Sequence, residues 1–255
     1  PEYVGEMKYD GLGIDLQYIK GKLVRALTRG DGLEGEDVTT NVKQIKDIPH
    51  KLTGKFADIF ESLNIRGEIF MKKSVMKELN ESSTKKLANT RNAAAGSIRQ
   101  LDPNVTRHRK LNFFPYTVAD YSTESNDLPT THFDWLKLLS SLGFKINQYT
   151  EVLSSSKALV DYHNTIEQLR GTLDYDIDGV VYKVNNIGLQ KHLGFISTEP
   201  KWAVAHKFLA EQKTTEVLAI DIQVGRTGKL TPVARVKPIF VSGTTINNIT
   251  LHNEE

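Results

Sequence analysis

The sequence predicts an α+β protein whose strands pair antiparallel, followed by a smaller all-β segment. Residues 13–28 alternate between apolar and polar side chains on both sides of a glycine turn, which is typical of a β-hairpin. Two later stretches repeat their apolar residues at helical spacing and are each followed by a glycine. Beyond about residue 210 the helical spacing disappears, and only alternating patterns remain.

The first half of the chain is expected to hold a hairpin, two further strands and one short helix. Lys20-Gly21 supplies the turn of the hairpin over residues 13–28. Residues 65–71 and 111–118 are rich in residues that favour strands. Residues 91–101 are rich in alanine and contain one glycine, which predicts a short helix.

The second half is expected to begin with two amphipathic helices and to continue in strands. Phe133, Leu136, Leu139 and Leu142 form one apolar helix face, and Gly143 stands where a helix ends. A second helix is predicted over residues 156–170, with Gly171 after it. Residues 177–184 and 202–208 indicate buried strands. Three more strands are predicted at residues 217–224, 230–241 and 244–251.

This change of pattern predicts two domains, residues 1–209 and 210–255. The second has too few strands to close a barrel, so we expect it to be incomplete. The chain begins with Pro1 and ends soon after a strand-like stretch, and we interpret both ends as cut from a longer protein.

Composition excludes several classes of protein. Of 255 residues, 39% are hydrophobic, which is enough for a core and excludes a disordered chain. No apolar run approaches the roughly 18 residues of a membrane span. The absence of cysteine excludes disulfides, thiol nucleophiles and zinc sites built on thiolates, and it fits a reducing cytoplasm.

The charge is distributed unevenly along the chain. Residues 85–110 hold seven basic residues and one acid, a local charge of +6 within a total of +2, so that the remainder carries −4. This basic window is either a solvated surface or a contact face for phosphate or nucleic acid.

Three lysines are candidates for chemistry. Lys8 lies beside acids and a glycine turn, whereas Lys183 and Lys207 lie in otherwise apolar strands. A buried lysine is costly unless it is paired or neutral, so it is seldom present without a role. Asp178 is five residues from Lys183, and a regular strand would direct the two to opposite faces. We therefore expect one of them at a strand end or a bulge.

Several motifs together resemble the covalent nucleotidyltransferase superfamily, which contains DNA ligases, RNA ligases and capping enzymes. They are KYDG at residues 8–11, RGE at 66–68, DGVVYK at 178–183 and KWAVAHK at 201–207. Two longer stretches, residues 28–39 and 91–102, are similar to bacterial-type NAD-dependent DNA ligases in particular. The resemblance implies a nucleotidyltransferase (ATP-grasp-like, DNA ligase adenylation) fold of antiparallel sheets flanked by helices, followed by a partial OB-fold.

The resemblance implies that Lys8 is the nucleophile that takes AMP from NAD. Its amine must be neutral to attack, and neighbouring cations such as Lys183 and Lys207 favour the neutral form. The same two cations, with Arg91 or Arg99, would neutralise charge that develops on the phosphate.

The other site residues implied by the resemblance bind the nucleotide or act beside Lys8. Glu6 and Glu68 would hold the adenosine, and Tyr116 would stack on the adenine, although its apolar surroundings also suit a core residue. Asp10 and Asp178 would act near the metal or orient the lysine. Two arginines in polar segments, Arg29 and Arg170, are expected to contact phosphate.

The resemblance also implies the cofactors and partners. NAD would supply AMP, Mg²⁺ is the expected metal, and nicked double-stranded DNA is the expected substrate, in replication and repair. No pair of histidines has metal-binding spacing, and no residue is assigned as a metal ligand. The basic window of residues 85–110 would meet the DNA backbone. A cytoplasmic, nucleoid-associated monomer is expected, with no membrane contact.

The chain departs from the family pattern in three respects. The helical domain that recognises the nicotinamide mononucleotide half of NAD is absent from this sequence, so we expect slow self-adenylylation from NAD. Gly13 and His206 stand where a small residue such as alanine and an aromatic residue are usual. Two alternatives stay open: an ATP- or GTP-using relative, and a non-catalytic module that binds nucleic acid.

Overall fold

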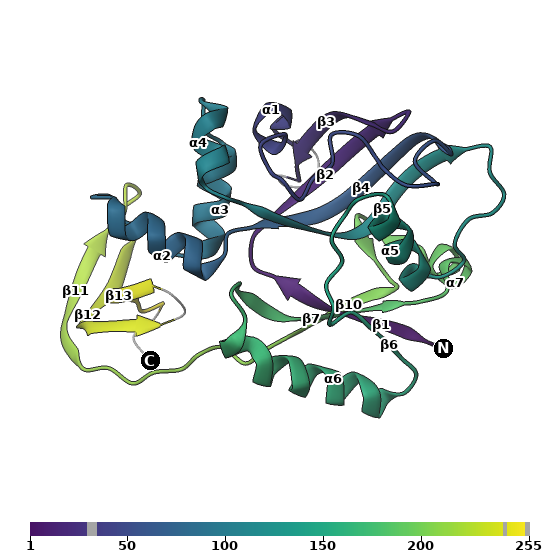
Figure 1. The fold of residues 1–255 in the computed structure, drawn as a ribbon. Helices are drawn as coiled ribbons and strands as arrows, with labels where there is room; N and C mark the ends of the chain where they lie inside the picture. Colours follow the sequence, from purple (N-terminus) through teal and green to yellow (C-terminus); the bar gives the residue numbers. More distant parts are fainter. Residues whose placement is uncertain (30–34, 242–243, 253–255) are drawn as a thin grey trace. The chain divides into compact units, whose positions relative to one another are not determined.

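Two four-stranded antiparallel sheets and the helices around them form the larger part of the protein (Figure 1). The computed structural model describes residues 1–29, 35–241 and 244–252. They separate into two units, Pro1–Phe208 and Leu209–Glu255. The Gly30-Asp31-Gly32 part of the family resemblance lies outside the described residues.

The first sheet, which we call the β2 sheet, contains the predicted hairpin. Its strands are β2 (Leu12–Ile19), β3 (Lys22–Thr28), β4 (Phe60–Phe70) and β5 (Asn112–Thr123), in the order β3-β2-β4-β5. Lys20 and Gly21 both have positive φ, 47° and 74°, as a two-residue hairpin turn requires. Residues of β2 and β4 alternate between fully buried and partly exposed, so one face packs on the core and the other is polar.

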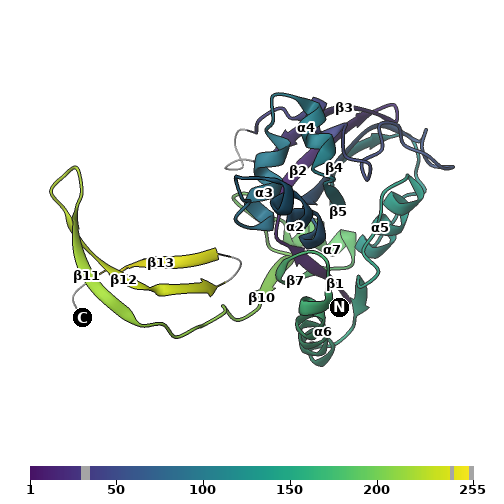
Figure 2. The same cartoon turned by 60° about the vertical axis from the view of Figure 1, so that its left-hand side comes forward.

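The second sheet, the β1 sheet, carries the lysine motifs. Its strands are β1 (Tyr3–Tyr9), β6 (Glu151–Leu153), β7 (Ile177–Val184) and β10 (Ala203–Lys207), in the order β10-β7-β1-β6. Helix α6 (Ser156–Leu169) lies along one face of it (Figures 1 and 2), and Tyr162 and Ile166 of the helix join Met7 and Val180 in a small core.

The core face of the β2 sheet is covered by helices whose starts are well capped. Helix α3 (Thr90–Ile98) is capped by Asn89 and α5 (His132–Ser141) by Thr131, and both contribute to the largest hydrophobic cluster. Asp102 caps α4 (Pro103–His108), with a proline in its first turn. The remaining short elements are α1 (Thr39–Val42), α2 (Lys73–Ser82), η1 (Arg170–Thr172), α7 (Ile187–Leu193), β8 (Phe195–Ile196) and β9 (Glu199–Pro200).

The second unit is a three-stranded antiparallel sheet. It consists of β11 (Val217–Val224), β12 (Leu230–Val241) and β13 (Thr244–Thr250). Ile220 and Ile222 of β11 are more than half exposed, and Val233 and Val236 of β12 are buried. The described helices include none that is long and apolar enough to cross a membrane.

Most predicted elements are confirmed, and one expectation about burial is wrong. The strand predicted at residues 202–208 exists as β10, but Val204, His206 and Lys207 are exposed rather than buried. The reason is its position: among the described strands β10 pairs only with β7, and it forms an edge of the β1 sheet. An apolar sequence pattern does not distinguish an edge strand from a central one.

Candidate active site

One face of strand β1 carries polar side chains of the site, and the opposite face packs against the hydrophobic core. Glu6 and Lys8 share a face because side chains two residues apart in a strand point the same way. Gly5 and Met7 point to the opposite face, where a side chain on Gly5 would collide with the Tyr162 ring of α6 at 2.7 Å. The packing of α6 therefore fixes which side chains β1 turns toward the site.

A bulge places Asp178 beside Lys8. Lys8 pairs with Gly179 and Tyr9 pairs with Ile177, so that Asp178 is the extra residue of β7. Nζ of Lys8 donates to Oδ2 of Asp178 at 3.3 Å and lies 3.3 Å from Oδ1 as well. The expectation that Asp178 or Lys183 lies at a bulge or a strand end is confirmed.

Further acids and one arginine surround Lys8. Nη1 of Arg91, at the start of α3, lies 3.8 Å from Oδ1 of Asp10. Burial and the nearby charge of Asp178 raise the pKa of Asp10, against the influence of Arg91. Burial also raises the pKa of Glu68 to about 7, although Lys8, Arg91 and a hydrogen bond from the backbone of Gly11 lower it. The group around Lys8 is thus rich in carboxylates, and the side chains of Lys8, Asp10 and Asp178 are each about a third exposed.

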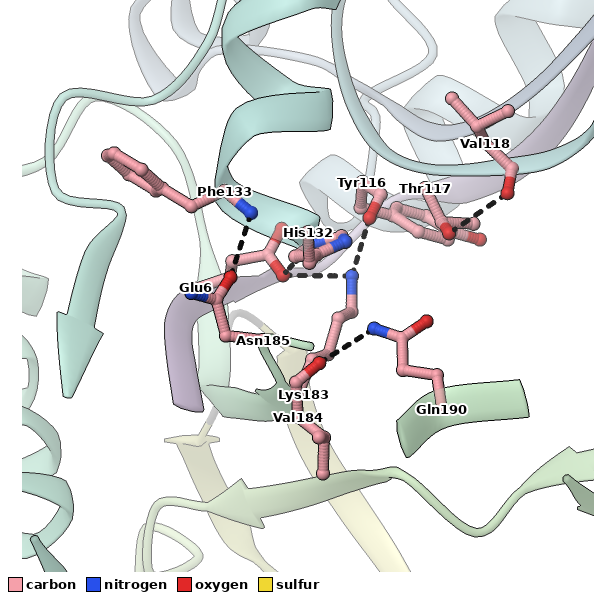
Figure 3. Close-up of polar contacts among 10 residues, drawn as sticks. All are labelled: Glu6, Tyr116, Thr117, Val118, His132, Phe133, Lys183, Val184, Asn185 and Gln190. Atoms are coloured by element: carbon pink, nitrogen blue, oxygen red, sulfur yellow. Dashed lines mark hydrogen bonds and ion pairs between the residues drawn. The ribbon is translucent and has the colours of Figure 1, made fainter. Parts of the chain in front are cut away.

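A second polar group lies deeper, and Figure 3 shows it. Glu6, His132 and Lys183 are 5%, 3% and 6% exposed, so all three are withdrawn from water. Oε2 of Glu6 accepts from Nζ of Lys183 at 2.9 Å and lies 3.0 Å from Nε2 of His132. The two partners lower the pKa of Glu6, although burial alone would raise it. Lys183 also donates to the carbonyl of Tyr116 at 2.6 Å.

The Tyr116 ring is held on two sides. Its hydroxyl is hydrogen-bonded to Arg29, and Nζ of Lys183 lies 5.1 Å from the ring centroid. Both residues line, together with Tyr116, a cavity of about 570 Å³ between the two sheets, which His132 and Trp202 also border. A cavity of this size, with an aromatic wall and several convergent polar groups, is typical of a small-molecule site.

The three lysines do not lie together. Lys8, Gly179 and Lys207 form one row across β1, β7 and β10, so Lys207 shares the face of Lys8. Lys183 pairs with Val4, four residues from Lys8 along β1, or about 13 Å at the usual rise of a strand. Lys183 is buried as expected, whereas the expectation that Lys207 is buried is wrong because β10 is an edge strand.

Two of the predicted arginines have partners elsewhere. Arg99 donates to Glu36 at 2.9 Å, and the guanidinium of Arg170 lies 5.2 Å from the centre of the Phe208 ring. Their predicted contacts with phosphate stay predictions. The predicted site residues that do meet one another are Lys8 with Asp178, Asp10 with Arg91, Glu6 with Lys183, and Tyr116 with both Arg29 and Lys183.

Two polar residues of the site were missed by the sequence analysis. His132 follows the N-cap of α5, and nothing in the local sequence distinguishes it from an ordinary first-turn residue. Arg66 lines the cavity and donates to Asp15 at 3.0 Å. Arg66 belongs to the RGE motif and alternates in phase with Glu68 along β4, so period-two alternation could have identified it.

The carboxylates beside Lys8 are a chemically suitable place for a hard cation. Within the described residues no group of three histidine or carboxylate side chains could hold a metal ion unaided. Mg²⁺ commonly uses one or two carboxylates and completes its shell with water and substrate phosphate. Oδ1 of Asp178 accepts no hydrogen bond from the described residues, although it lies 3.3 Å from Nζ of Lys8, so it keeps a lone pair for a cation.

Comparisons with known proteins match both parts of the sequence to one family. The family model of the NAD-dependent DNA ligase adenylation domain matches residues 1–211, and that of the NAD-dependent DNA ligase OB-fold domain matches residues 214–255. A DNA ligase of Bartonella quintana (strain Toulouse) is 48% identical over 258 residues, which cover the whole chain and 35% of that protein. The chain therefore spans about a third of the length of this relative.

Solved structures resemble the chain more distantly. They include a mycobacterial DNA ligase D complexed with ATP and MES (15% identity, 91% of this chain and 62% of that one, TM-score 0.41). The ligase domain of M. tuberculosis LigD is similar at 14% identity over 91% of this chain and 61% of that one, with a TM-score of 0.41. The matches of the family models to both parts of the sequence show that the chain belongs to the NAD-dependent DNA ligase family.

Proposed function

We propose that this chain carries the adenylyl-transfer core of an NAD-dependent DNA ligase. The neutral amine of Lys8 attacks the adenylyl phosphorus of NAD, the bond to nicotinamide mononucleotide breaks, and a lysyl-AMP phosphoramidate remains. AMP then passes to the 5′-phosphate of nicked double-stranded DNA, and the 3′-hydroxyl displaces it to seal the backbone.

The observation that carries this proposal is the position of Lys8. It lies 3.3 Å from Asp178, on the same face of β1 as Glu6. Glu6 in turn reaches through Lys183 to Tyr116 and the cavity. A nucleotide whose base stacks on Tyr116 would have its phosphate on the side of Lys8, and Glu68 would accept from a ribose hydroxyl.

Basic side chains near Lys8 would neutralise the charge of the nucleotide phosphate. Lys207, in the same row as Lys8, and Arg91, beside Asp10, are placed to neutralise charge on its oxygens. Lys183, Arg99, Arg29 and Arg170 are expected to approach it only if their present contacts change. Asp10 and Asp178 would hold Mg²⁺, which supplies charge neutralisation at the phosphate when bound.

Labelling of the chain tests this function. Because self-adenylylation from NAD is expected to be slow, we expect intact-mass spectrometry after prolonged incubation with NAD and Mg²⁺ to show a slow gain of one AMP, attached to Lys8, and ATP or GTP to give much less. Lys8→Ala abolishes the gain, whereas Lys157→Ala, on the exposed side of α6, leaves it unchanged. Labelling that persists in Lys8→Ala, or that prefers ATP or GTP, would contradict the proposal.

A further inference from the structure

We propose that His132 is a positioning residue that holds Glu6 so that the pocket distinguishes a 6-aminopurine from a 6-oxopurine. This inference rests on the proposed function, because it assumes that the base of the adenosine enters the cavity beside Tyr116. It concerns a side chain that the motifs do not include and that borders the cavity.

The backbone around His132 is fixed to the end of β7. The backbone N–H of His132 donates to the carbonyl of Asn185 at 2.7 Å, and that of Phe133 donates to Oδ1 of Asn185 at 3.0 Å (Figure 3). The side chain of Thr131 caps the same helix start. The imidazole therefore approaches Glu6 from a rigid support that reaches the strand of Lys183.

The protonation states of His132 and Glu6 decide which of the two is the donor in their hydrogen bond. Burial lowers the pKa of His132 despite the attraction of Glu6, so the ring is neutral at pH 7. The pKa of Glu6 is lowered by Lys183 and His132, and its carboxylate only accepts hydrogen bonds. Nε2 of the neutral ring must then carry the proton and donate it to Oε2 of Glu6.

This arrangement leaves a matched donor and acceptor for a base. Lys183 and His132 both bind Oε2 of Glu6, so among the described residues Oε1 is the oxygen left to accept from a ligand. Lys183 has three N–H donors, of which Glu6 and the Tyr116 carbonyl use two. Adenine offers an amino donor next to a ring acceptor, whereas hypoxanthine offers a carbonyl oxygen that a carboxylate repels.

Without His132, the carboxylate of Glu6 would keep Lys183 as its one partner among the described residues. It could then turn its oxygens away from the position of the 6-substituent, and Lys183 would follow it. Removal of His132 would reduce the discrimination between bases more than the affinity for the ribose, which Glu68 is expected to bind.

Binding of adenosine and inosine to the whole chain, measured by calorimetry, tests the inference. We expect the wild-type preference for adenosine to fall about tenfold in His132→Leu, the size typical of a lost polar contact in a specificity site. His132→Gln, which keeps a neutral N–H donor of similar reach, should restore most of it, whereas the shorter His132→Asn should not. Nitrogen NMR should show the Nε2–H tautomer of His132 at pH 7–8, above the usual pKa of histidine.

The matched control is His163→Leu. His163 is also buried, but it stacks on His206 at 3.7 Å and lies on α6, away from Glu6. This variant should keep the full preference for adenosine. Equal preferences in the Leu variant and the wild type would overturn the inference. If the Leu variant does not fold, equal preferences in the Gln and Asn variants would do the same. A wild-type chain that binds both nucleosides equally also overturns it, yet leaves AMP labelling of Lys8 as a separate result.

Discussion

Glu68 shows how burial changes the chemistry of a single residue at this site. Its carboxyl group, withdrawn from water on β4, has a pKa raised to about 7, so it titrates in the range in which the protein is studied. A ribose hydroxyl that donates to Glu68 binds the ionised form better than the protonated one. Binding of adenosine should therefore depend on pH.

We expect the affinity for adenosine to rise with pH through about 7. Between pH 6 and pH 8 the ionised fraction of Glu68 grows from roughly a tenth to nine-tenths, which corresponds to a roughly tenfold gain in affinity. Adenosine has no phosphate that titrates in this range, so calorimetry with it isolates the protein group. The same experiment should show proton release on binding.

The control for this prediction is Glu68→Gln. This variant should bind adenosine more weakly at pH 8 and lose the pH dependence between pH 6 and pH 8. A pH profile that survives the substitution would assign the titration to another group.

Site residues that belong to a motif can be predicted from the sequence. Their contacts cannot be predicted where these depend on strand pairing. Asp178 was expected at a bulge because its separation from Lys183 conflicts with regular alternation, and that is confirmed. The partner of Lys183 was not predictable. Which residue lies opposite it depends on the register between β1 and β7, whose paired residues are more than 160 positions apart in the chain.

At the scale of elements, the pairing of β7 with β10 depends on one glycine. A side chain on Gly179 would place its Cβ 2.5 Å from the carbonyl oxygen of His206 and 2.7 Å from Cα of Lys207. These are backbone atoms, which move only if the strand moves. The close approach of β10 to β7 thus requires glycine at the position between Lys8 and Lys207.

We expect Gly179→Ala to lower the free energy of unfolding by about 1–3 kcal/mol, the usual cost of overpacking. Chemical denaturation followed by fluorescence would measure it. AMP labelling should fall by more than stability alone explains, because displacement of β10 also moves Lys207.

Gly96→Ala is the control for this prediction, because it is the same substitution at a position with space for the side chain. Gly96 lies within α3, and a Cβ there would meet nothing within 4 Å. Alanine should therefore stabilise the protein by about 0.5–1 kcal/mol, through a lower entropy of the unfolded chain. Equal effects of the two substitutions would contradict the role given to the space around Gly179.

Elements with a strong local signal were predicted, and elements that depend on tertiary contacts were not. Lys20-Gly21 marks the turn of the β2–β3 hairpin in the sequence. Gly143, whose φ is 111°, marks the end of α5. Strand β1 was not predicted, because every one of its inner positions from Val4 to Met7 is buried and shows no alternation. Helix α4 was missed as well, although Asp102-Pro103 is a recognisable start.

At the scale of the whole molecule, the small net charge does not show that the basic residues at 85–110 fall into two sets with different surroundings. Arg91, Arg99, Arg107 and Lys110 contact Asp10, Glu36, Gln44 and Glu78, respectively. Lys85 and Arg109 instead line a hollow of about 350 Å³ beside α3. Charge counted along the sequence could not separate these two sets, because it does not show which cations already contact other side chains.

The last prediction follows from that separation and concerns binding of nicked duplex DNA. A cation that lines an open hollow can neutralise a backbone phosphate and release a counterion, so its removal should reduce the salt dependence of binding. We expect the double substitution Lys85→Ala and Arg109→Ala to make the slope of log affinity against log salt less steep by about 2, as two lost phosphate contacts would. The control pair, Lys137→Ala and Lys157→Ala, removes the same charge from lysines that already pair with Asp134 and Asp161. Fluorescence anisotropy at several salt concentrations measures both slopes, and an equal change in the two pairs would show that DNA senses only the net charge of the protein.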